Sequence, residues 1–210
     1  MEKSYIKFIN NNFLKEVNIN KEQINEIQVF INYAIKEHLY TYSKVMYHDL
    51  KHIERVLIYA MWIINSMNIK FSRKDLNILM YSILFHDSGR SLGAKDKDHG
   101  IIGAKVAYNK LNEILDKNEI KAIMLLIKTH AVNDDKVYFD YEIKEKDKKK
   151  IQLLSNILKD SDALDRNRLK LFPFWKCNPK YLRTDEAIEI FKKADKLYKE
   201  YCKAVKKQKN

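Results

Sequence analysis

Histidine and aspartate side chains recur at core-facing positions of the predicted helices. Residues three, four or seven apart share one face of a helix, so each of these side chains can be placed relative to an apolar stripe. Four polar residues fall on such stripes: His52, His86, His130 and Asp162. A lone histidine on an apolar face is usually a hydrogen-bonded core residue, whereas a buried carboxylate needs a cation or several donors.

One divalent ion would satisfy several of these groups at once. The candidate ligands are His52, His86, Asp87 and Asp162. Two imidazoles with two carboxylates suit Zn, Mn, Fe, Co or Ni better than Ca, and Mg is also compatible with the site. The sequence therefore predicts a metal site built from distant parts of the chain.

The segment "SILFHDSGR", residues 82–90, carries two of these residues side by side. Neighbouring residues of a helix diverge by about 100°, so His86 and Asp87 can reach one ion only where the helix is ending. Ser88 and Gly89 follow directly, and glycine is a favoured helix terminator. We expect the helix break to help form the site.

The elements that must position these residues are predicted to be helices. Glycine and proline are scarce, with four and two residues respectively, and they cluster in short segments. Asn20 with Gln23 and Ser72 with Asp75 are capping signals at helix starts. Helical spacing predicts helices at about 22–40, 49–67, 72–86, 100–115, 118–130, 147–164 and 185–205. Residues 137–144 alternate in polarity, which fits a short strand or an extended loop.

Composition limits the class of protein. The chain has 210 residues, of which 46% are hydrophobic and 32% charged, a globular balance that suits one domain with extensions. No apolar run approaches the roughly 20 residues needed to cross a bilayer, and no signal peptide is recognisable. With only Cys177 and Cys202, no disulfide framework is available, so a cytoplasmic location is expected. The net charge of +12 favours anionic partners such as nucleotides or nucleic acid.

The ordered set of motifs resembles the HD superfamily of metal-dependent phosphohydrolases. The matching blocks are "HIERVLIYA" (52–60), "ILFHDSGR" (83–90), "DHGIIGAKVA" (98–107), "IKTH" (127–130) and "LKDSDALDR" (158–166). The resemblance implies an all-α bundle of about seven or eight helices. It divides the chain into an N-terminal extension (1–43), a metal-binding core (44–168) and a C-terminal extension with a basic tail (169–210).

The resemblance also implies roles for individual residues. His52, His86, Asp87 and Asp162 are carried over as ligands of one metal. His99 and His130 match positions that bind a second metal or substrate phosphate. The stretch "YHDLKH" (47–52) resembles a motif of eukaryotic-type cyclic nucleotide phosphodiesterases, with Asp49 in place of Asn, which makes His48 a candidate proton donor. The G-Y-P signature of cyclic-di-GMP phosphodiesterases does not occur.

The predicted activity is hydrolysis of a phosphate ester or anhydride of a nucleotide by metal-activated water. Asp87, His48 and Arg90 are the expected catalytic residues, while Arg90, Lys95, His99 and His130 are expected to hold phosphate. Arg55 and Arg166 are expected to support the site through carboxylates such as Asp165. Gly93 and Gly100 are expected to let the loop at residues 91–100 approach the substrate closely. His38 matches no motif and is expected to be structural.

Two other functions fit the same sequence. A basic helical protein could bind nucleic acid through lysine-rich and tyrosine-rich surfaces such as residues 196–207. A regulatory protein could use the metal only to join its helices. The sequence specifies neither the substrate nor the oligomeric state.

Overall fold

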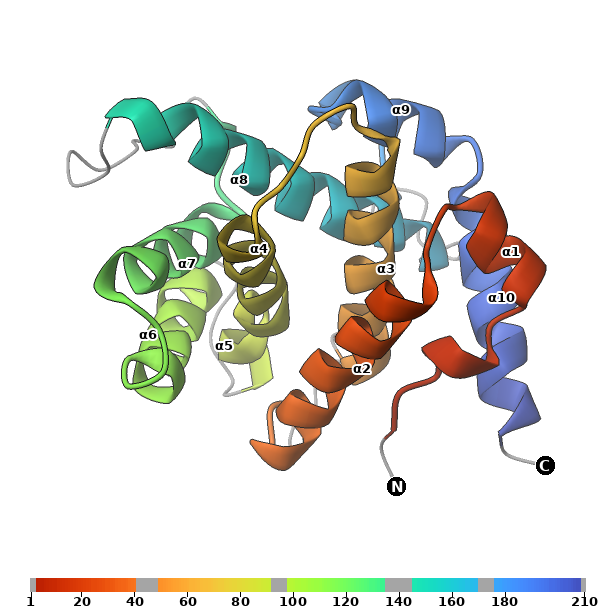
Figure 1. Ribbon diagram of the computed structural model, residues 1–210, viewed down its shortest axis with the longest axis horizontal. Coiled ribbons are helices and arrows are strands. Elements are labelled where there is room, and N and C mark those ends of the chain that lie inside the picture. Colours follow the sequence, from red (N-terminus) through yellow and green to blue (C-terminus); the bar gives the residue numbers. More distant parts are fainter. Residues whose placement is uncertain (1–2, 41–48, 92–97, 135–144, 170–175, 209–210) are drawn as a thin grey trace.

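The computed structural model describes residues 3–40, 49–91, 98–134, 145–169 and 176–208, and every element within these ranges is helical (Figure 1). This confirms the predicted all-α fold. The elements are η1 (Ile6–Phe8), α1 (Asn11–Glu16), α2 (Lys21–Lys36), α3 (Leu50–Ser66), α4 (Arg73–Phe85), α5 (Ser88–Ser91), α6 (His99–Leu111), α7 (Lys117–Thr129), α8 (Glu145–Asp165), η3 (Arg166–Arg168), η5 (Pro179–Tyr181), α9 (Asp185–Phe191) and α10 (Ala194–Lys207).

Local capping explains where several helices start. Asn20 and Gln23 form a reciprocal capping box at α2, and Ser72 and Asp75 form another at α4, as predicted. Asp49 accepts a hydrogen bond from the backbone N–H of His52 and so caps α3. The cap therefore fixes the first turn of α3, which carries His52.

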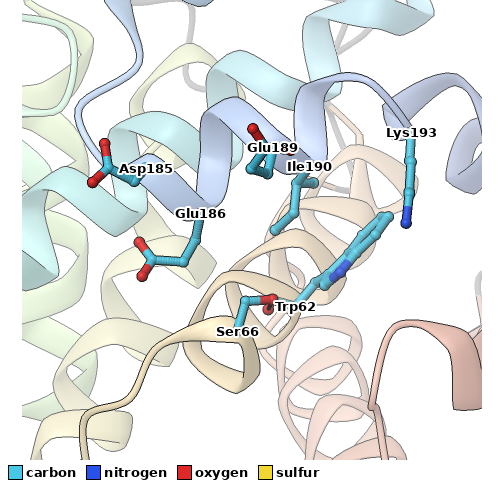
Figure 2. A pocket seen from close by; sticks show the side chains of 7 residues that line it. All are labelled: Trp62, Ser66, Asp185, Glu186, Glu189, Ile190 and Lys193. Atoms are coloured by element: carbon cyan, nitrogen blue, oxygen red, sulfur yellow. Dashed lines mark hydrogen bonds between the residues drawn. The ribbon is translucent and has the colours of Figure 1, made fainter.

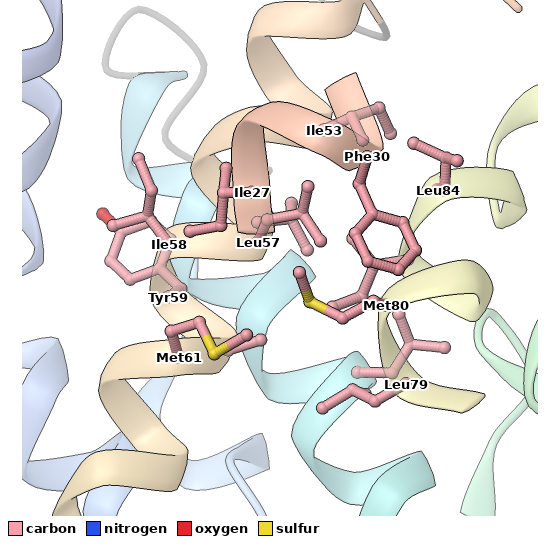
Figure 3. Packing of buried hydrophobic residues seen from close by; sticks show 14 of the residues in the cluster. Ile27, Phe30, Ile53, Leu57, Ile58, Tyr59, Met61, Leu79, Met80 and Leu84 are labelled. Carbon is pink, nitrogen blue, oxygen red and sulfur yellow. The ribbon is translucent and has the colours of Figure 1, made fainter. Parts of the chain in front are cut away.

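Helix α3 is the centre of the bundle. Apart from Lys51, its side chains are buried from Leu50 to Ile64, and it packs against α8, α2 and α4. Figure 3 shows how Ile53 and Leu57 of α3 meet Phe30 of α2 and Leu84 of α4. Because α3 is covered on every side, even its charged residues must find partners inside the protein.

The structure differs from the predicted boundaries at two places. The helix predicted for residues 185–205 is two helices, α9 and α10, which meet at a turn where the backbone N–H of Lys193 donates to Ile190 O. The helix predicted to reach residue 40 ends at Lys36, because His38 has a positive φ of 54° and Leu39 N–H donates to Ala34 O. His38 thus terminates α2, in keeping with the structural role expected of it.

Glycines bring α5, α6 and α7 close together. A Cβ on Gly89 would lie 2.1 Å from the carbonyl oxygen of His99, and one on Gly100 would lie 2.9 Å from that of Ile127. Two sequence expectations were wrong here. Gly100 lies buried in α6 rather than in a loop beside substrate, and Gly89 lies within α5 rather than ending α4. Their lack of a side chain permits close backbone packing instead.

Other predicted features lie outside the described ranges, including residues 137–144 and most of the proline-bounded segment 171–179. None of the helices described has both the length and the apolar character needed to span a membrane.

Candidate metal centre

Six polar side chains from five helices and their ends converge in the interior. We call them the metal-site cluster: His52, His86, Asp87, His99, His130 and Asp162. Helix α3 contributes His52 from its first turn, and the chain just after α4 contributes His86 and Asp87. His99 begins α6, His130 follows α7, and Asp162 lies near the end of α8. Helix ends thus supply most of the cluster, as the break between Phe85 and Ser88 illustrates.

The first half of the cluster contains His52, His86 and Asp162. His52 Nε2 lies 3.5 Å from Asp87 Oδ2 and 3.4 Å from Asp162 Oδ1. His86 Nε2 lies 3.4 Å and 3.9 Å from the same two oxygen atoms. Two nitrogen atoms and two carboxylate oxygen atoms therefore face a common point.

The second half contains His99 and His130, on the other side of Asp87. His99 Nε2 lies 3.5 Å and His130 Nε2 3.8 Å from Asp87 Oδ1. The two Nε2 atoms are 2.9 Å apart. The two oxygen atoms of Asp87 thus face different halves of the cluster.

Hydrogen bonds on the far side of the rings fix the tautomers. Carbonyl oxygen atoms only accept, so the Nδ1 atoms of His86 and His130 must donate to Ile83 O at 2.7 Å and Ile127 O at 2.6 Å. His52 Nδ1 lies 2.8 Å from the Asp165 carboxylate. In a neutral ring, the proton on Nδ1 leaves a lone pair on Nε2, the form that binds metals.

The residues present fit a divalent ion. His86 Nε2 is buried and forms no hydrogen bond with any part of the chain that the structure describes. Ligands about 2.1 Å from a tetrahedral or octahedral ion would be about 3.0–3.4 Å apart, close to the spacings in the first half. Candidate ligand atoms of His52, His86 and Asp162 all lie within 4.8 Å of one another, as do those of His86, Asp87 and His130.

Asp165 contacts His52 at Nδ1, the ring nitrogen that points away from the cluster. Its carboxylate accepts hydrogen bonds from Arg55 Nε at 2.7 Å and from Arg168 Nη1 at 2.9 Å, besides its contact with His52. Burial would raise the pKa of Asp165, but the charge of Arg55 and the bond to His52 outweigh it and lower the pKa to about 2. Asp165 is therefore a stable anion that orients the imidazole of His52. Arg55 thus contacts the carboxylate through which it was expected to support the site.

Arg166 lies at the solvent side of the cluster. Its guanidinium is 3.6 Å from Asp162 Oδ2, and its side chain is 52% exposed, whereas that of Asp162 is 17% exposed. Burial would raise the pKa of Asp162, but Arg166 and the neighbouring imidazoles hold it well below its usual range. Asp162 is the most exposed of the four proposed ligands, which marks the side from which solvent reaches them.

The remaining predicted site residues divide into two groups. Arg90 Nε donates to Asp87 Oδ1 at 2.8 Å, so Arg90 lies beside the cluster. His48 and Lys95 lie outside the described residues.

Sequence reasoning missed Glu54, which is 1% exposed. It accepts hydrogen bonds from Ser4, the backbone of Tyr5 and Ile6, and Tyr201. No local signal could have revealed these partners, because they come from both ends of the chain.

A separate pocket lies between the end of α3, helix α9 and Lys193, the residue before α10 (Figure 2). Its volume is about 350 Å³. The lining residues are Trp62, Ser66, Asp185, Glu186, Glu189, Ile190 and Lys193. None of them belongs to the metal-site cluster, and three carboxylates beside one lysine would repel a phosphate.

Comparison with known protein families identifies the class of protein. The family model described as HD domain matches residues 49–167, which is more than half of the chain and includes the whole metal-site cluster. The chain belongs to the HD-domain family, a superfamily of metal-dependent phosphohydrolases whose members bind divalent metals. Neither the curated proteins nor the solved structures compared with the chain gave a match.

Proposed function

We propose that this protein is a phosphohydrolase that cleaves a phosphate ester or anhydride of a nucleotide at the metal-site cluster. The observation that carries the proposal is the convergence of His52, His86, Asp87 and Asp162, with the buried Nε2 of His86 left without a hydrogen bond among the described residues. Family membership supports the reaction type, and the positive charge of the chain suits an anionic substrate.

The proposed ligands of the ion are His52, His86, Asp87 and Asp162. A bound divalent ion would supply a Lewis acid that lowers the pKa of water toward neutrality and polarises a phosphoryl oxygen. Asp165 would keep the imidazole of His52 in its metal-binding tautomer, and Ile83 O would do so for His86. These anchors reduce the reorganisation that binding requires.

Several groups around the ligands would hold the substrate. Arg90 is 18% exposed at its side chain, and Arg166 is half-exposed at the solvent side of Asp162. A guanidinium at either place can donate two hydrogen bonds to one phosphate group. We propose Arg90 as the main phosphate-binding residue, His99 and His130 as ligands of phosphate or of a second ion, and Lys95 and His48 as a further phosphate contact and the proton donor.

The experiment is a metal and substrate panel. Protein stripped with a chelator is reloaded separately with Mn, Fe, Co, Ni, Zn or Mg, and each form is assayed on p-nitrophenyl phosphate, bis(p-nitrophenyl) phosphate, nucleoside phosphates and cyclic nucleotides. We expect product release with at least one ion, lost on renewed chelation. Asp87→Ala is the matched inactive control.

Three outcomes separate this function from its alternatives. Hydrolysis that survives in Asp87→Ala, or none with any ion, contradicts the proposal. Bound metal with a large loss of thermal stability on chelation but no turnover supports a structural metal. Strongly salt-dependent binding of nucleic acid that is indifferent to Asp87→Ala supports a nucleic-acid-binding protein. We also propose that residues 1–43 and 169–210 are extensions of a core at 44–168.

A further inference from the structure

We infer that the C-terminal helix α10 is part of the support of the metal centre, with Tyr198 and Tyr201 acting as positioning residues for Arg55. This inference rests on the proposed metal site, but it does not depend on which substrate is cleaved. Helix α10 lies outside residues 49–167, the range matched by the family model, so the role is a feature of this chain rather than of the match.

The contacts form an unbroken path from α10 to a proposed ligand. The guanidinium carbon of Arg55 lies 5.1 Å from the ring centre of Tyr201 and 5.6 Å from that of Tyr198. The same guanidinium donates two hydrogen bonds to Asp165, at 2.7 Å and 3.1 Å. Asp165 in turn contacts His52 Nδ1 at 2.8 Å.

Each contact on this path restricts the orientation of the next side chain. Two aromatic rings leave Arg55 only 5% exposed and attract its positive charge. A guanidinium held in one plane presents its fork to both oxygen atoms of Asp165, which a flexible ammonium group could not do. The fixed carboxylate then sets the orientation of the His52 ring, and with it the direction of Nε2.

Hydrogen bonds attach α10 to α3, so the rings of Tyr198 and Tyr201 are held in position beside Arg55. Tyr201 donates to the buried carboxylate of Glu54, the neighbour of Arg55. Tyr59 donates to Ala194 O at the first residue of α10. The hydrogen bond from Tyr59 attaches α10 through the backbone of Ala194 and does not involve Arg55, so Tyr59→Phe is a matched control.

The test measures the affinity of the metal-free full-length protein for Mn²⁺ by isothermal titration calorimetry, together with its melting temperature without metal. Arg55→Lys keeps the charge but removes the fork, and we expect Mn²⁺ binding to weaken about 10-fold. Tyr198→Leu removes one ring from a half-buried position, and we expect a loss of about 3-fold. Tyr198→Phe keeps the ring and should keep the wild-type affinity. Tyr59→Phe should lower the melting temperature and leave Mn²⁺ affinity unchanged.

Two results would overturn the inference. One is wild-type Mn²⁺ affinity in Tyr198→Leu or in Arg55→Lys. The other is a loss in Tyr59→Phe as large as that in Tyr198→Leu, which would mean that α10 contributes only general stability. A wild-type protein that binds Mn²⁺ but hydrolyses nothing refutes the proposed function alone. A wild-type protein that binds none of the six ions of the metal panel refutes both.

Discussion

The two halves of the metal-site cluster share Asp87 but differ in the hydrogen bonding of their imidazole Nε2 atoms. In the first half, both imidazoles are anchored through Nδ1 and direct Nε2 toward carboxylate oxygen atoms. In the second half, the Nε2 atoms of His99 and His130 face each other at 2.9 Å. Because His130 donates through Nδ1, its neutral ring can only accept at Nε2, so His99 must then donate the shared proton.

Because of this difference, the first half needs less rearrangement than the second before it can bind an ion. The first half needs only the loss of any proton on Nε2 before it can bind. The second half must also break a histidine–histidine hydrogen bond, and Arg90 already occupies the Asp87 oxygen that faces it. We therefore expect a first ion to bind more tightly than a second.

The largest expected effect comes from Asp87, the one carboxylate that faces both halves. Asp87→Ala should lower the rate of hydrolysis by about 10³-fold or more, because it removes an anionic ligand and the partner of Arg90 together. Product release and elemental analysis of the same samples are the measurements. A variant that retains both its metal and its rate would show that Asp87 is no ligand.

Paired histidine variants test the order of binding directly. His86→Ala should leave almost no bound metal, whereas His130→Ala should keep one ion per chain and lose about 10- to 100-fold in activity. Elemental analysis after gel filtration gives the stoichiometry. Equal metal loss in the two variants would remove the distinction between the halves.

Arg90→Ala should have a smaller effect than the histidine substitutions, and it should act mainly on the second half of the cluster. It frees Asp87 Oδ1 and removes a phosphate contact, so we expect KM for the substrate to rise about 10-fold while the first ion is retained. Steady-state kinetics and metal content measure the two effects. Arg166→Ala is the comparison, since that residue lies beside Asp162 in the first half. A KM that stays at the wild-type value in Arg90→Ala would contradict the phosphate role.

The smallest effect concerns stability without metal. Burial would lower the pKa of His86, but Asp87 and Asp162 outweigh it and raise the pKa from 6.5 to about 9. A raised folded pKa stabilises the protein fully below the unfolded value, and that contribution is lost as pH rises toward 9. In chelator, the free energy of unfolding should thus fall by about 1 kcal/mol per pH unit between those values. Urea titrations measure it, and His86→Gln should flatten the slope.

Much of the fold followed from local signals, because a capping residue and its partner lie only three positions apart. Asn20 with Gln23 and Ser72 with Asp75 act where the sequence predicted. Asp162 was recognisable because it interrupts an apolar stripe. Its position 3.4 Å from His52 Nε2 agrees with the predicted convergence, while the role of each residue as a ligand stays a prediction.

What the sequence could not reveal depends on distant contacts. Glu54 lies three and four residues before the apolar Leu57 and Ile58, but the sequence does not show that the N-terminal segment and α10 supply its hydrogen-bond donors. The division between α9 and α10 has no glycine or proline to signal it. The close approach of α6 to α5 needs Gly89, whereas the sequence alone suggested that Gly89 ends a helix.

The carboxylate of Glu54 has a consequence for biosynthesis. It is shared by residues near position 5 and by Tyr201, which is 147 positions farther along the chain than Glu54. During translation, Tyr201 must therefore emerge from the ribosome before Glu54 has all its hydrogen-bond donors. Until then a buried acidic group in the central helix lacks one of its partners, so nascent chains should acquire metal only late in synthesis.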